Sequence, residues 1–281
     1  MKPIKDLTFT DDFMFGEIMK NEEICKGVIE RLLHIKVEKL ELITLQETIA
    51  PYYETRGVRF DVYVKDSDKV YDIEIQNKKF AEIEKRTRYY QSMIDMDLLA
   101  KGANFKELKE SYVIFICKTD PFDLGEPCYK VKSIFEKHPE KIFDDKTHKV
   151  FYNASAYKKE TDPEIYAFLQ YISTNIPDDD FTSGIFDKVE KAKENEQFRS
   201  DYMRCNIHDF DIMEEGKELG IAIGKEEGIA IGEERGRSEA KLEAARNMLL
   251  TNLGTIEQIA AVQSLPLETV QKLAEELKTE A

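Results

Sequence analysis

The sequence predicts an α/β domain in which helices flank a mixed β-sheet, and three neighbouring stretches support this. Residues 58–76 alternate apolar and polar side chains in two runs, which is typical of a β-hairpin. Residues 80–101 place apolar side chains at helical spacing. Residues 112–117 form a continuous apolar run, typical of a strand buried on both faces. Hairpin, helix and buried strand in this order indicate layers of helix and sheet around one core.

The hairpin pattern also predicts a register. Its runs, 58–65 and 70–76, flank polar residues 65–69. An antiparallel pairing across a two-residue loop, with paired residue numbers that sum to 135, lays both apolar sets on one side. That apolar side comprises Phe60, Val62, Val64, Tyr71, Ile73 and Ile75. A longer loop would shift the pairing by two residues but keep every side chain on the same face.

The same register brings two acidic side chains together. It places Glu74 opposite Asp61, and Gln76 opposite Arg59. Directly opposed residues have Cβ atoms about 5 Å apart, and like charges there are destabilising. The two carboxylates therefore favour a cation between them, and hard oxygen ligands suit Mg²⁺ or Mn²⁺, ions that often bind phosphate substrates. The alternative interpretation is a pair of solvated side chains on the open face of an amphipathic hairpin.

Residues before the hairpin predict a helix and a strand. Threonine and aspartate, including Asp11 and Asp12, precede apolar residues at helical spacing that extend to residue 33. A carboxylate in this place can cap the helix by accepting hydrogen bonds from its free N–H groups. Residues 37–45 then predict a strand, and residues 47–56 predict a polar loop that leads into the hairpin.

The helix predicted over residues 80–101 ends at Gly102 and begins in the most basic stretch of the chain. The basic residues of that stretch are Lys78, Lys79, Lys85, Arg86 and Arg88. They follow the acidic pair directly, so a phosphate backbone could lie here. An ordinary solvated helix face is the alternative.

The remainder of the domain has weaker patterns. Residues 129–135 read as strand-like, residues 148–153 predict an edge strand, and residues 163–174 predict a helix. The acidic residues 178–180 then mark a boundary. We therefore expect a domain over residues 1–177, followed by a helical linker over residues 178–215.

A glycine repeat follows the linker, over residues 216–238. Its glycines are Gly216, Gly220, Gly224, Gly228, Gly232 and Gly236. Each costs a helix about 1 kcal/mol relative to alanine, so a helix here needs close packing against another segment or chain. Intervening charges exclude a membrane span. We interpret the repeat as a flexible or self-associating connector, and residues 239–281 as a small tail with two short helices at 255–261 and 265–270.

Composition restricts the class of protein. The chain has 281 residues, 35% of them charged, and a net charge of −15. This acidity argues against DNA binding through overall charge, although a local basic patch remains compatible with it. No signal peptide or membrane-length apolar run is apparent, and the four cysteines lack metal-binding spacing, so we expect a cytoplasmic protein with no membrane partner.

Four stretches resemble one known family. The hairpin reads RFDVYVKDSDKVYDIEIQNKK, and the others read TDDFMFGEIM, RTRYYQSMIDMDLLAKG and ESYVIFICKTDPF. Together they resemble the Rpn family of recombination-promoting nucleases, or putative transposases, within the PD-(D/E)XK nuclease superfamily. The resemblance spans roughly the first two-thirds of the chain and implies a restriction-endonuclease-like mixed sheet flanked by helices, with an α-helical C-terminal extension.

The resemblance also implies roles for particular residues. Catalytic residues would be Asp61, Glu74 and Gln76; metal ligands would be Asp61, Glu74 and Asp12; DNA-binding residues would be Lys78, Lys79, Arg86, Arg88 and Gln91. Two positions depart from the expected pattern. Gln76 replaces the superfamily's lysine, and Gly16 stands where a lysine is expected after the N-terminal aspartate.

The function implied is a metal-dependent DNA endonuclease that hydrolyses phosphodiester bonds with Mg²⁺ or Mn²⁺, linked to recombination or transposition. We also expect the chain to form a homo-oligomer through its C-terminal helical region. The alternative is a catalytically weak or inactive oligomeric scaffold that keeps the nuclease fold and binds nucleic acid. A third hypothesis is a nuclease gated by its tail, as in a defence system.

Overall fold

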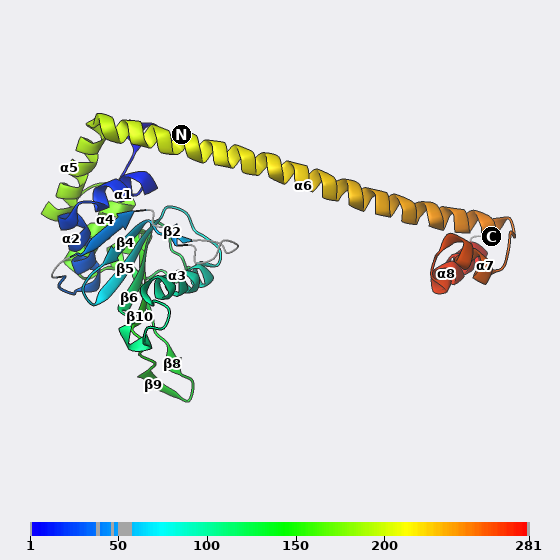
Figure 1. Ribbon diagram of the computed structural model, residues 1–281, viewed down its shortest axis with the longest axis horizontal. Coiled ribbons are helices and arrows are strands. Elements are labelled where there is room, and N and C mark those ends of the chain that lie inside the picture. Colours follow the sequence, from blue (N-terminus) through cyan, green and yellow to red (C-terminus); the bar gives the residue numbers. More distant parts are fainter. Residues whose placement is uncertain (1, 38–39, 46–47, 50–57, 280–281) are drawn as a thin grey trace. The chain divides into compact units, whose positions relative to one another are not determined.

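The computed structural model describes residues 2–37, 40–45, 48–49 and 58–279, and the chain divides into two compact units, Met1–Met203 and Arg204–Ala281 (Figure 1). The helices are α1 (Asp12–Met19), α2 (Glu22–Leu33), α3 (Ile83–Leu98), α4 (Pro163–Thr174), α5 (Asp180–Glu194), α6 (Glu196–Leu250), α7 (Ile256–Gln263) and α8 (Leu267–Thr279). The strands are β1 (Leu42–Leu45), β2 (Thr48–Ile49), β3 (Val58–Arg59), β4 (Val62–Lys65), β5 (Lys69–Gln76), β6 (Glu110–Cys117), β7 (Cys128–Val131), β8 (Ile134–Phe135), β9 (His138–Ile142) and β10 (Thr147–Asn153). Short 3₁₀ turns are η1 (Ile4–Asp6), η2 (Phe105–Glu107) and η3 (Ala154–Lys159).

A six-stranded mixed sheet organises the first unit, as the sequence predicts. Its strand order is β1-β4-β5-β6-β10-β7. Strands β5, β6 and β10 run parallel, whereas β1, β4 and β7 pair with their neighbours in antiparallel fashion. The expectation of an edge strand at residues 148–153 is wrong, because β10 lies between β6 and β7 and is hydrogen-bonded on both sides.

The hairpin register is confirmed where the ladder forms. Val62 pairs with Ile73 and Lys65 with Val70, so paired numbers sum to 135. The Asp66 N–H donates to the Lys69 carbonyl at 2.9 Å, which leaves a two-residue loop.

The first run of the hairpin is not one continuous strand, however. Its start, β3, pairs with β2, so Arg59 lies opposite Thr48, and the predicted pairing of Arg59 with Gln76 is wrong. Phe60 and Asp61 lie between β3 and β4, outside any strand. This interruption moves Phe60 away from the apolar face on which Val62 lies, and its ring packs on the opposite face beside Tyr63.

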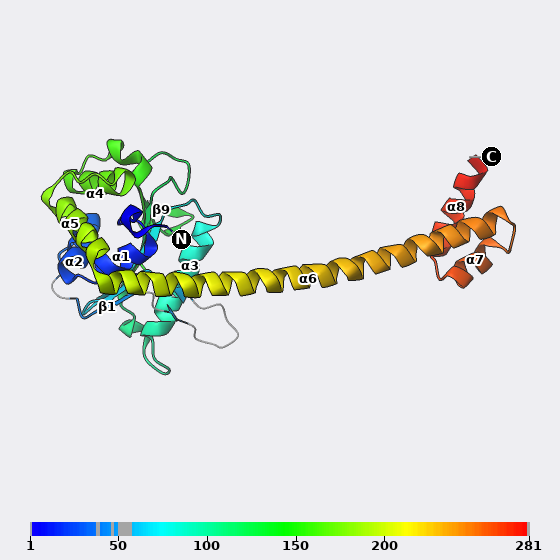
Figure 2. The ribbon, with the colours of Figure 1, turned by 90° about the horizontal axis from the view of Figure 1, so that it is seen from above.

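Both faces of the sheet are covered, so the hairpin has no open face. Figure 1 and Figure 2 show α1, α2, α4 and α5 on one side of the sheet and α3 on the other. Alternate residues of β5 divide accordingly: Tyr71, Ile73 and Ile75 belong to the larger core, while Val70 joins the core beneath α3. The polar side chains of β5 are therefore enclosed as well.

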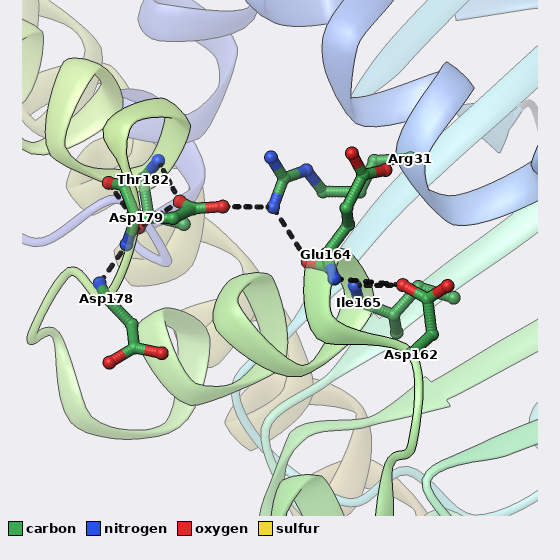
Figure 3. Close-up of polar contacts among 7 residues, drawn as sticks. All are labelled: Arg31, Asp162, Glu164, Ile165, Asp178, Asp179 and Thr182. Carbon is green, nitrogen blue, oxygen red and sulfur yellow. Dashed lines mark hydrogen bonds and ion pairs between the residues drawn. The ribbon is translucent and has the colours of Figure 1, made fainter.

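Residues 178–203, which we expected to form a linker, pack in the first unit. Ile185 and Val189 of α5, with Phe198 and Tyr202 of α6, are buried in its larger core. Asp179 caps α5 through the Thr182 N–H, and it accepts an ion pair from Arg31 at 2.5 Å (Figure 3).

The same arginine ties α5 to its neighbours. Its guanidinium also donates to the Glu164 carbonyl at 2.8 Å and lies over the ring of Phe181. Phe181 in turn lies so close to Gly27 of α2 that a Cβ on that glycine would clash with the ring. The predicted boundary at residue 178 therefore falls inside this packed unit, which ends near Met203.

The second unit consists of the rest of α6 with α7 and α8. Ala245, Ile259, Ala260 and Val270 form its small core. The predicted pair of short helices corresponds to α7 and α8. The glycine repeat lies inside α6, so it is helical throughout, and its glycines have open space where a Cβ would lie. Within the described ranges, no helix is long and apolar enough to cross a membrane.

Candidate active site

Asp61 and Glu74 are in direct contact, as the sequence predicts. The Asp61 N–H donates to Glu74 Oε1 at 2.9 Å, and the Ile75 N–H donates to Asp61 Oδ2 at 3.1 Å. One of these N–H groups is at Asp61, where the first strand is interrupted, and the other is at Ile75 on β5. The interruption between β3 and β4 therefore positions the Asp61 carboxylate over the end of β5.

Three polar side chains of β5 share the face beneath α3. Asp72, Glu74 and Gln76 alternate along the strand, and all three are buried. Both carboxylate oxygens of Asp72 lack a hydrogen-bond partner. Sequence reasoning did not select Asp72, although the two-residue period of a strand places it on the same face as Glu74.

Burial and neighbouring carboxylates raise the pKa of both acids. Burial, and then the charge of Asp61, raises the pKa of Glu74 to about 8. Burial raises the pKa of Asp61 to about 6, and the nearby charge of Asp12 adds to the effect.

Burial favours the protonated form of Asp72 as well. Burial and then the charge of Glu74 raise its pKa well above the usual value. Because neither of its oxygens is hydrogen-bonded, the ionised carboxylate would be costly to keep in this place without a cation.

Arg86 of α3 is the cation that contacts Glu74 and Gln76, while the charge of Arg59 is also close enough to lower the pKa of Asp61. Its Nη2 lies 3.4 Å from Glu74 Oε2, and its Nη1 lies 3.5 Å from Gln76 Oε1. Shorter bonds run to the Tyr90 hydroxyl, which accepts from Nε at 2.9 Å and from Nη2 at 2.6 Å. The rings of Tyr90 and Phe80 also lie beside the guanidinium.

Asp12 approaches the same group from α1. Asn77, directly after β5, donates from its side-chain amide to the Thr10 carbonyl, which ties the start of α1 to the end of β5. Asp11 is engaged in the preceding turn, where Oδ2 accepts from the Thr8 N–H at 2.6 Å. Burial and the charge of Asp11 raise the pKa of Asp12. Asp12 is thus held near Asp61, close enough to influence its pKa.

The side chains expected to bind DNA have different environments. Lys78, Lys79 and Arg88 are exposed, and Lys79 pairs with Asp123. Gln91 is buried instead, and its amide donates to Ser111 Oγ at 2.7 Å and to Asp95 at 3.0 Å. Its side chain is therefore engaged inside the domain.

The acidic cluster fits a hard divalent ion that keeps its waters. Across the described part of the chain, no three acidic, histidine or cysteine side chains form a ready-made cage for a metal. The donors present are carboxylates, and Asp72 adds buried oxygens without a partner next to Glu74. Mg²⁺ is commonly held by one or two carboxylates, with water and substrate phosphate completing the shell. Asp61 and Glu74, with Asp12 nearby, would supply those ligands.

The mixed sheet, with an aspartate and a Glu-x-Gln motif converging at the end of its central hairpin, defines a restriction-endonuclease-like α/β domain. The family described as PD-(D/E)XK nuclease family transposase matches residues 3–177, and the chain belongs to this family. No curated protein and no solved structure matches the chain.

Proposed function

We propose that this protein is a metal-dependent DNA endonuclease that hydrolyses phosphodiester bonds, in the setting of recombination or transposition. The observation that carries the proposal is the contact between Asp61 and Glu74 beside Gln76, in a chain of a nuclease family. Burial and neighbouring carboxylate charges raise the pKa of both acids, and a bound divalent cation would stabilise their ionised forms.

Four side chains have a proposed role in the hydrolysis. A divalent ion, when bound, would polarise the phosphodiester and lower the pKa of water. Asp61 and Glu74 would hold that ion, with Asp12 as a third ligand. Gln76 can orient the attacking water by hydrogen bonding, but a neutral amide supplies no positive charge.

DNA is the proposed partner. Lys78, Lys79 and Arg88 are exposed directly after β5 or on α3, so phosphates could lie across them next to the acids. We leave Gln91 out of this interface because its side chain is buried. Each lysine or arginine contact with phosphate contributes about one unit to the salt dependence of binding.

Plasmid cleavage tests the proposal. Supercoiled DNA is incubated with wild-type protein and Mg²⁺ or Mn²⁺, beside Asp61→Asn and Glu74→Gln. We expect nicking or linearisation by wild type, and at least about a 100-fold loss in both variants. Glu84→Gln, which changes an exposed acid of α3, serves as the matched control and should retain activity. Equal cleavage by all four proteins would indicate a contaminating nuclease and contradict the proposal.

A non-catalytic oligomeric scaffold is the second candidate, and one observation favours it. Among the described residues, α6 exposes large apolar side chains around the glycine repeat: Leu219, Ile221, Ile223, Ile229 and Ile231. Isoleucines in such number on a helix surface favour contact with another chain. Light scattering of Ile221→Ser/Ile229→Ser tests this: a mass equal to that of wild type would remove the assembly hypothesis, whatever the outcome for cleavage.

A further inference from the structure

The end of β5 that carries Glu74 presents a neutral amide, Gln76, and no cation. Gln76 follows Glu74 by two residues and faces the same way, yet its amide is neutral. Phosphodiester hydrolysis adds negative charge to the phosphoryl oxygens in the transition state, and fixed cations stabilise it strongly. A positive group is therefore expected within reach of Gln76.

Arg86 is a positively charged side chain within reach of Gln76. It comes from α3, the helix that covers this face of β5, and its guanidinium contacts both Glu74 and Gln76. Its contacts with the acid and the amide are long, 3.4 and 3.5 Å, whereas those with the Tyr90 hydroxyl are 2.6 and 2.9 Å. Tyr90 thus fixes the guanidinium, and the acid is left loosely paired.

The surroundings of Arg86 keep it in place. Tyr90 is buried, and it packs edge-on against Phe60 with ring centroids 5.3 Å apart. Its hydroxyl accepts two hydrogen bonds from one guanidinium, a rigid arrangement that a flexible surface arginine would lack. Arg88, two residues on, is exposed and points from a different part of the helix.

We infer that Arg86 is a catalytic residue that supplies the positive charge missing at Gln76, and that Tyr90 is the residue that positions it. This inference rests on the proposed nuclease function. In the hydrolysis, a water oxygen forms a bond to phosphorus while the bond from phosphorus to a deoxyribose oxygen breaks. The water loses one proton and the leaving oxygen gains one, which yields a phosphate monoester and an alcohol. Arg86 donates hydrogen bonds to the phosphoryl oxygens throughout and transfers no proton.

Steady-state cleavage kinetics separate this role from DNA binding. Arg86→Gln should lower kcat about 100-fold with little change in KM, because a transition-state contact is lost. Arg88→Gln should instead raise KM with kcat retained, because a phosphate contact is lost. Arg86→Lys, which keeps the charge without the planar fork, should recover part of the lost kcat. Equal kcat in wild type and Arg86→Gln would overturn the inference.

A rescue experiment tests the assignment directly. In Arg86→Gln, the second change Gln76→Lys returns a cation to the strand, so we expect kcat to recover at least about tenfold. Guanidinium ion added to Arg86→Ala should also restore cleavage in a saturable way. Failure of both rescues, with folded protein, would contradict a role based on positive charge.

Tyr90→Phe tests the positioning role. The variant keeps the ring that packs on Phe60 but removes the hydroxyl that holds the guanidinium. We expect kcat to fall about tenfold, and no further loss when Tyr90→Phe is added to Arg86→Gln. Additive losses would show that Tyr90 acts independently of Arg86.

Mn²⁺ binding provides a readout apart from cleavage. Calorimetry on Arg86→Gln should show Mn²⁺ affinity equal to or above that of wild type, because the guanidinium competes with the ion for Glu74. Loss of Mn²⁺ binding would mean that Arg86 merely maintains the site, and would overturn its catalytic assignment. If wild type itself cleaves no DNA, the proposed nuclease function is wrong. If wild type and Arg86→Gln both cleave DNA with equal kcat, only the catalytic role of Arg86 is wrong.

Discussion

Asp72, Glu74 and Gln76 lie on one buried face of β5, and the two acids among them have different contacts. Glu74 contacts Asp61 through a backbone N–H and pairs loosely with Arg86. Asp72 is buried with neither carboxylate oxygen hydrogen-bonded, and burial raises its pKa. Removing ionised carboxylates from water is costly, so this face favours protonated acids or a bound cation.

This arrangement predicts how stability depends on pH. The pKa of Glu74 rises from 4.5 in the unfolded chain to about 8 in the folded protein, so the folded state keeps a proton that the unfolded chain has released. That contribution is present at low pH and is lost as pH rises through the folded pKa. The free energy of unfolding should therefore fall by roughly 1.4 kcal/mol per pH unit within this window.

Urea unfolding in a chelator, at several pH values across that window, measures the slope. Glu74→Gln should flatten it, and Glu84→Gln, a change at an exposed acid, should keep the wild-type slope. Parallel curves for wild type and Glu74→Gln would contradict the prediction. Added Mg²⁺ should raise stability most at high pH, where the acids are ionised.

At the scale of elements, α5 joins the domain through a close contact with α2. Arg31 connects the two helices by its ion pair with Asp179, and the ring of Phe181 lies against Gly27 (Figure 3). A Cβ at position 27 would overlap the outer atoms of the Phe181 ring, so a larger residue there requires the ring to move. The contact explains how a charged segment that resembles a linker becomes part of the core.

Substitution of two glycines tests this contact. Gly27→Ala should destabilise the protein by about 1–3 kcal/mol, because the added methyl group collides with Phe181. Gly184→Ala on α5, where a Cβ meets open space, should instead stabilise it by about 0.5–1 kcal/mol. Chemical denaturation of both variants measures the difference. Equal stabilities would mean that α5 does not dock as described.

At the scale of the whole molecule, the two compact units differ in how they are stabilised. The first has two cores on either side of its sheet, and the second has only a small core among three helices. The division near Met203 places the glycine repeat entirely in the second unit. The proposed nuclease function of the first unit can therefore be tested separately from the proposed assembly through α6.

Truncation tests whether the first unit ends near Met203 or at the boundary predicted at residue 178. A chain that ends after Met203 should fold, because it retains the buried Ile185, Val189, Phe198 and Tyr202. A chain that ends at Asp180 loses all four, at about 1.5–3 kcal/mol each, which is enough to unfold a typical domain. Circular dichroism and thermal unfolding compare the two chains. A stably folded shorter chain would contradict the packing described here.

Features that depend on local periodicity could be predicted from the residues alone. Alternation at period two predicted the hairpin register and the proximity of Asp61 to Glu74, and helical spacing predicted α3 and α4. Both patterns involve residues close together in the sequence, so they can be recognised without knowledge of the fold. The family and its sheet were also apparent at this level.

What covers each face of the sheet depends on tertiary contacts that no local pattern predicts. Because α3 lies over β5, Asp72 is buried and Arg86, rather than Arg88, reaches Glu74. The interruption of the first strand places Asp61 where it accepts a hydrogen bond from the Ile75 N–H, and Phe181 packs against Gly27 where α5 meets α2. These outcomes depend on contacts between residues far apart in the chain, and burial changes the electrostatic behaviour of a side chain without any change in its own sequence surroundings.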